Sequence, residues 1–144
     1  MGPAENKAIV RRFIEEAFNT GNLSVIDDLV AADYVNHAAG LQDAGGPEGM
    51  KHFVTTYRTA FPDYNCTIEA QIAEGETVVT RWTVRGTHHG PLMGIPPTGK
   101  RVTLSGIVMD RLAHGKLAET WLQADVLGML QQVGVIPAAE PASA

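Results

Sequence analysis

The 144-residue chain is 44% hydrophobic and 19% charged, and its formal net charge at pH 7 is −5. This composition is that of an ordinary globular protein, and the length is typical of one domain. The basic residues form no cluster larger than a pair, so the chain lacks the concentrated positive charge with which proteins bind nucleic acids.

No apolar run approaches the ~20 residues that span a membrane, and the first residues lack the charged-then-apolar pattern of a signal peptide. We therefore expect a cytoplasmic protein with no membrane partner. One domain is expected over residues 1–137, and the small residues of segment 138–144 are expected to form a disordered tail.

Helices are predicted in the first part of the chain. Over residues 6–18, apolar side chains recur at steps of three and four, which is typical of a helix with one buried face. A short helix is expected over residues 24–30, followed by an extended piece at 34–37. Another helix begins near Pro47 and ends before Pro62. Its apolar face consists of Met50, Phe53, Val54, Tyr57 and Phe61.

After Asp63 the apolar period changes to two, which indicates strands. The first strand should place Cys66, Ile68, Ala70 and Ile72 on one face. The single cysteine of the chain, Cys66, cannot form an internal disulfide and is expected to be a small buried hydrophobe.

Three more strands are predicted, and a helix closes the chain. The strands cover residues 77–89, 100–113 and 117–125, and the helix covers 126–133. Helices that precede an antiparallel meander indicate an α+β fold with the helices packed on one face of the sheet.

Three segments carry a family resemblance. They are GTHHGPLMGIPPTGK at residues 86–100, GKLAETWLQAD at 115–125 and LGMLQQVGVIP at 127–137. Together they resemble the SnoaL-like polyketide cyclases, or ester cyclases, of the nuclear-transport-factor-two-like superfamily, over about residues 5–137. The resemblance implies a cone-shaped fold, in which a curved antiparallel sheet wraps around the N-terminal helices and leaves an apolar pocket. It is much less specific for the reaction, because this fold hosts several chemistries.

Asp125, at the end of the last predicted strand, has two interpretations. An Asp before a helix is a natural N-cap. The spacing from Trp121 to Asp125 also resembles the family position of the catalytic acid/base carboxylate, which would move a proton to or from a carbon acid.

Other site residues follow from the resemblance. It implies that Asn36 and His37 face the substrate and polarise a carbonyl or stabilise an oxyanion, although a loop Asn-His pair also serves backbone groups. Substrate-binding roles are expected for Trp82, Trp121, His88 and Met93, although a tryptophan in a strand is more often a core residue.

The chain departs from the family in one stretch. The aldol-condensing relatives hold a histidine on the penultimate strand, whereas residues 108–112 contain none. Arg111 is a candidate substitute that would stabilise an oxyanion, or it lies on the outer face. The histidines show no metal-ligand spacing, so neither a metal nor another cofactor is expected.

The resulting hypothesis is a cyclase-type enzyme that performs cofactor-free acid/base chemistry on a small apolar carbonyl compound. Its prototype is the intramolecular aldol cyclisation of a polyketide ester, with Asp125, His37 and Asn36 as catalytic residues. The alternatives are a non-catalytic binding domain, or an epoxide hydrolase or isomerase on the same fold. By family resemblance we expect a homodimer formed through the outer face of the sheet.

Overall fold

The computed structural model describes residues 2–38 and 45–137, so the tail expected at 138–144 lies outside the described residues. The N-terminal half contains α1 (Pro3–Phe13), the π-helical segment η1 (Ile14–Asn19), α2 (Ser24–Leu29), β1 (Val30–Ala38) and α3 (Gly46–Ala60). The second half contains β2 (Asn65–Glu74), β3 (Thr77–Thr87), β4 (Arg101–Ala113), β5 (Lys116–Ala124) and α4 (Val126–Gln132). The described helices include none long and apolar enough to cross a membrane.

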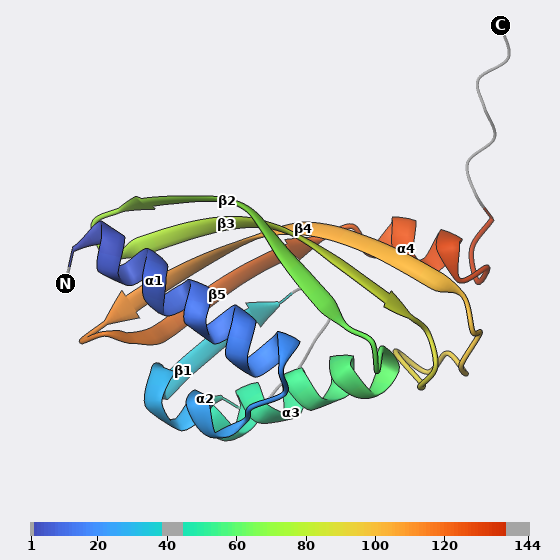
Figure 1. Ribbon diagram of the computed structural model, residues 1–144, viewed down its shortest axis with the longest axis horizontal. Coiled ribbons are helices and arrows are strands. Elements are labelled where there is room, and N and C mark those ends of the chain that lie inside the picture. The colour runs from blue at the N-terminus through green and yellow to red at the C-terminus, as the bar shows by residue number, and fades with distance from the viewer. Residues whose placement is uncertain (1, 39–44, 138–144) are drawn as a thin grey trace, which may run out of the picture.

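The strands form one curved, five-stranded sheet in the order β1-β5-β4-β3-β2. The meander from β2 to β5 is antiparallel, whereas β1 pairs with β5 in parallel. The sheet arches over α1, α2 and α3, which cover its concave face (Figure 1). The predicted α+β class and the curved sheet are therefore confirmed. The parallel strand at the edge is an addition that the local pattern did not indicate.

A β-bulge in β2 changes the predicted face of that strand. Ile68 pairs with Trp82 and Ala70 pairs with Arg81, so Glu69 is an extra residue that shifts the alternation by one position. Cys66 is buried, but Ile72 is 70% exposed. The prediction that Ile72 shares the buried face with Cys66 is therefore wrong, because a one-residue insertion moves every later side chain to the opposite face.

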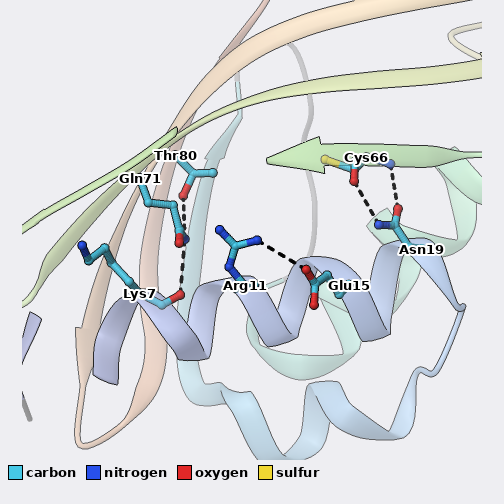
Figure 2. A network of polar contacts seen from close by, with 7 residues as sticks. All are labelled: Lys7, Arg11, Glu15, Asn19, Cys66, Gln71 and Thr80. Atoms are coloured by element: carbon cyan, nitrogen blue, oxygen red, sulfur yellow. Dashed lines mark hydrogen bonds and ion pairs between the residues drawn. The ribbon is translucent and has the colours of Figure 1, made fainter. Parts of the chain in front are cut away.

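Two amide side chains fix helices to strands by imitating a strand backbone. At the end of η1, Asn19 Nδ2 donates to the Cys66 carbonyl at 3.0 Å and Asn19 Oδ1 accepts from the Cys66 N–H at 2.7 Å (Figure 2). At the end of α4, Gln132 makes the equivalent pair with the N–H and carbonyl of Thr103, at 2.8 and 2.9 Å. Each amide satisfies two backbone groups that a neighbouring strand would otherwise have to satisfy.

We expect Asn19→Ala to lower the free energy of unfolding by about 1–3 kcal/mol, because it leaves two partly buried backbone groups of Cys66 without partners. Urea unfolding followed by circular dichroism measures the change. Asn65→Ala is the matched control: Asn65 is exposed on the same strand, and its substitution should change stability by no more than about 0.5 kcal/mol. Equal stability of the two variants would contradict the role of Asn19.

Candidate functional site

A cavity of about 100 Å³ lies between the concave face of the sheet and the helices. Its wall is mostly apolar and rich in aromatic rings. Phe13 and Phe18 come from the first helical segments and Phe53 from α3, while Trp82 comes from β3. Tyr64, which precedes β2, stacks on Phe18 with 5.5 Å between the ring centroids. A concave apolar space with few polar groups is the usual form of a small-molecule site.

The polar groups of the wall include a carboxyl group, that of Asp110 on β4. Asp110 is only 3% exposed and is the only Asp or Glu among the cavity-lining residues of the described chain. Burial raises the pKa of Asp110 to about 7, an effect that the hydrogen bond from Thr120 partly offsets. At neutral pH this carboxyl group is therefore poised between its neutral and charged forms.

Asp110 belongs to a row of three polar residues on adjacent strands. In the sheet register, Asn36 on β1 is opposite Thr120 on β5, and Thr120 is opposite Asp110 on β4. All three line the cavity. The Thr120 hydroxyl donates to Asp110 Oδ1 at 2.6 Å. Asn36 Oδ1 is buried and has no hydrogen-bond partner among the described residues, so it remains available to a ligand.

Two other ionisable groups of the wall, the Cys66 thiol and the Tyr64 hydroxyl, favour their neutral forms at neutral pH. Burial raises the pKa of the Cys66 thiol to about 12 and that of the Tyr64 hydroxyl well above its ordinary value. No Lys, Arg or His lines the cavity within the described part of the chain. The ionised Asp110 therefore has no cationic partner in the wall.

Three predicted site residues lie together on the opposite, convex face of the sheet. Glu119 Oε2 is 2.7 Å from His37 Nε2, and Glu119 Oε1 accepts from Arg111 Nε at 3.2 Å. The His37 ring stacks on Trp121 with 5.3 Å between the centroids. Adjacent residues of a strand point to opposite faces, so His37, Arg111 and Trp121 point away from the cavity that their neighbours Asn36, Asp110 and Thr120 line.

Asp125 is exposed and forms the N-cap of α4, where its Oδ1 accepts from the Gly128 N–H at 3.0 Å. The cap interpretation is therefore confirmed. Asp125 is not among the residues that line the cavity, so the structure does not bring it together with Asn36. Its catalytic role stays a prediction that a substitution can test.

The other predicted substrate-binding residues are divided between the cavity and other places. Trp82 lines the cavity and packs over Gly106 on β4, where a side chain would overlap the indole ring. Met93 is 52% exposed. His88 is buried against Phe61, and its Nδ1 is 3.0 Å from Thr98 Oγ1. Neither Met93 nor His88 lines the cavity.

Sequence reasoning missed Asp110 and Thr120, although a signal for Asp110 was present. In β4 the even-numbered residues Val102, Leu104, Val108 and Leu112 are apolar, so the same alternation points Asp110 into the core. A carboxyl group on the apolar face of a strand is rare unless it has a function or a partner.

The described residues contain no group of three or more His, Cys, Asp or Glu side chains placed to hold a metal ion. The expectation that no metal or other cofactor takes part stays a prediction.

The buried carboxyl group should make stability depend on pH. The folded-state pKa of Asp110, about 7, lies above its ordinary value of 3.8, so its contribution to stability is full below about pH 4 and is lost as the pH rises through 7. The loss is at most about 4 kcal/mol. Asn does not titrate, so the stability of Asp110→Asn relative to the wild type should be higher at pH 8 than at pH 5.

Urea unfolding at both pH values measures this difference. The matched control is Asp28→Asn, at an exposed position of α2, which should follow the wild-type pH dependence. A stability difference between Asp110→Asn and the wild type that is the same at pH 5 and pH 8 would show that Asp110 ionises normally.

Comparisons with known proteins identify the family and the fold of the chain. The pattern of the SnoaL-like polyketide cyclase family matches residues 8–133. The chain is 31% identical over 129 residues to aklanonic acid methyl ester cyclase DnrD of Streptomyces peucetius, covering 88% of each chain. It is 31% identical over 122 residues to nogalonic acid methyl ester cyclase of Streptomyces nogalater, covering 82% of this chain and 90% of the relative. TsrD from Streptomyces laurentii has the same fold, with a TM-score of 0.86, 26% identity, and 94% and 99% of the two chains covered. The chain therefore belongs to the SnoaL-like polyketide cyclase family.

Proposed function

We propose that this protein is a cytoplasmic cyclase-type enzyme that performs cofactor-free acid/base chemistry on a small apolar carbonyl compound in the internal cavity. The observation that carries the proposal is the buried carboxyl group of Asp110, which faces the cavity and has a pKa of about 7. A group with a pKa near the working pH can both take and return a proton. Two relatives are named methyl ester cyclases, which supports cyclisation as the reaction.

The prototype reaction is an intramolecular aldol cyclisation. Ionised Asp110 removes a proton from the carbon beside one carbonyl group, and that carbon forms a bond to a second carbonyl carbon of the same molecule. The proton on Asp110 then passes to the oxygen of the second carbonyl, so the carboxylate is restored and no electrons are exchanged with a cofactor. An amide N–H of Asn36, in the same row of residues, is suited to donate to the enolate oxygen.

The cavity is large enough for only a small reacting group of a substrate. Its volume of about 100 Å³ is below the ~150 Å³ of an engineered cavity that holds benzene. In this conformation a large substrate would place only its reacting end beside Asp110. The aromatic wall keeps water from that end, which strengthens the interaction between Asp110 and the developing charge.

A second candidate is a binding domain without catalysis. It is favoured by the cavity wall, which contains no His, Lys or Arg within the described residues, and by the position of Asp125 as a helix cap. Epoxide hydrolysis has less support, because a carboxylate network that positions water needs a second acid, and Asp110 is the only one in the described wall.

The catalytic proposal predicts opposite results for two aspartates. Asp110→Asn should lower kcat/KM by about 10²–10⁴-fold, because it removes the proton-transfer group. Asp125→Asn should keep wild-type turnover, because Asn is an equally good N-cap. Aklanonic acid and nogalonic acid methyl esters, the compounds in the names of two relatives, are the first substrates to assay.

The other possible outcomes of these assays distinguish Asp110 from Asp125, and an enzyme from a binding domain. Full activity of Asp110→Asn would refute the role of Asp110, and a selective loss in Asp125→Asn would support Asp125 as the acid/base residue. Wild-type protein that binds these esters without converting them or any related ester would favour the binding domain.

We also propose that the protein forms a homodimer through the convex face of the sheet. This face exposes apolar side chains on three adjacent strands: Val35 is 46% exposed, Ile107 is 49% exposed, and Met109 and Trp121 are each 37% exposed. Apolar side chains gathered on one face are typical of a protein interface. A second copy of the chain presents the same apolar face, so a two-fold arrangement buries both at once.

Light scattering coupled to gel filtration tests the homodimer. The wild type should have twice the mass of one chain, and the double variant Ile107→Lys/Trp121→Lys should have the mass of one chain, because it places charges in the interface. Ile72→Lys is the matched control, since Ile72 is 70% exposed on β2, at the opposite edge of the sheet from β1. This control should remain a dimer. A monomeric wild type, or a dimeric double variant, would contradict the proposal.

A further inference from the structure

We propose that Thr120 is the positioning residue of the site: its hydroxyl group holds Oδ1 of Asp110, so that Oδ2 is the oxygen that exchanges a proton with the ligand. This inference rests on the proposed function of Asp110. It gives a separate role to each of the two carboxyl oxygens. It concerns a residue that contacts Asp110 and acts through it.

The geometry of the pair supports a fixed arrangement. Asp110 and Thr120 are directly opposite each other on antiparallel strands, and both side chains point to the concave face. They are 3% and 6% exposed. The distance from Thr120 Oγ1 to Asp110 Oδ1 is 2.6 Å, which is within the range of a hydrogen bond from a hydroxyl group to an ionised carboxyl group. Thr is β-branched, so its side chain has few rotamers in which to move away.

This hydrogen bond distinguishes the two oxygens of the carboxyl group. Because Oδ1 accepts the Thr120 proton, the proton of the neutral acid is held on Oδ2. When Asp110 ionises, Thr120 stabilises the charge that remains on the carboxylate. Without the hydroxyl group, either oxygen could carry the proton, and the carboxyl group could rotate between the two arrangements.

Among the groups around Asp110, Thr120 is the one whose hydrogen bond lowers the pKa of the Asp110 carboxyl group. On β3 the residue opposite Asp110 is Val78. The other titratable groups in the described wall are Tyr34, Tyr57, Tyr64 and Cys66. Arg111 and Glu119 flank the pair in sequence, but they point to the convex face and bind each other there. Burial raises the pKa of Asp110, and the Thr120 hydrogen bond is the interaction that lowers it.

The test follows the ionisation of Asp110 directly, by ¹³C NMR of the side-chain carboxyl groups, with Asp110→Asn used to assign the resonance. Thr120→Val keeps the branched shape and removes the donor. It should raise the titration midpoint of Asp110 by about 1–2 pH units, the size expected for a hydrogen bond to a charged group. The midpoint of the pH profile of kcat/KM should move by the same amount. Thr120→Ser keeps the donor and should restore the wild-type midpoint.

A matched control separates the hydrogen bond from a general effect of repacking. Thr80 is also fully buried on the concave face, but its hydroxyl contacts Gln71. Thr80→Val should leave the Asp110 midpoint unchanged. Thr120→Ala removes the same donor and replaces Thr120→Val if valine disturbs the packing.

An unchanged or lower midpoint in the folded variant without the donor would overturn the positioning role. The proposed function fails separately, through an active Asp110→Asn enzyme. The NMR titration requires no substrate, so it assigns the role of Thr120 whatever the turnover assay shows.

Discussion

The structure depends on one constraint: the curved sheet has a single covered face, and every side chain that points to it must fit under three helices. Neighbouring residues in a strand point to opposite faces, so one position of register decides whether a residue is in the cavity or in solvent. Asp110 and Thr120 are inside, whereas their neighbours Arg111 and Glu119 form an ion pair outside. The separation of site and surface therefore follows from strand register.

The covered face would hold only apolar groups if stability alone determined it. Asp110 is an exception, because ionising its buried carboxyl group near pH 7 costs stability. The hydrogen bond from Thr120 offsets part of this cost without bringing a second charge into the cavity. A positive partner would lower the pKa of Asp110 and leave a weaker base. A neutral partner keeps the pKa near the pH at which proton transfer is efficient.

Membership in the polyketide cyclase family makes this arrangement informative. His37, which was expected from the family resemblance, and Arg111, the candidate substitute for the histidine of the relatives, are bound to Glu119 on the convex face. Asp125 caps α4. The cavity instead combines Asn36, Thr120 and Asp110 in one row across three strands. A shared fold thus accommodates a particular set of polar residues, and the chemistry must be read from the cavity itself.

The sequence by itself determined the α+β class, the four strands of the meander and the helices, because helical and strand periods are local properties of the chain. It also carried the alternation that points Asp110 inward. Only the tertiary structure decided which polar residues meet, since β1 pairs with β5 across more than half of the chain. Register shifts at Glu69 in β2 and at Ala118 in β5 likewise arise from contacts between strands. A bulge leaves no regular pattern in the local sequence, yet it reverses the face of every residue that follows.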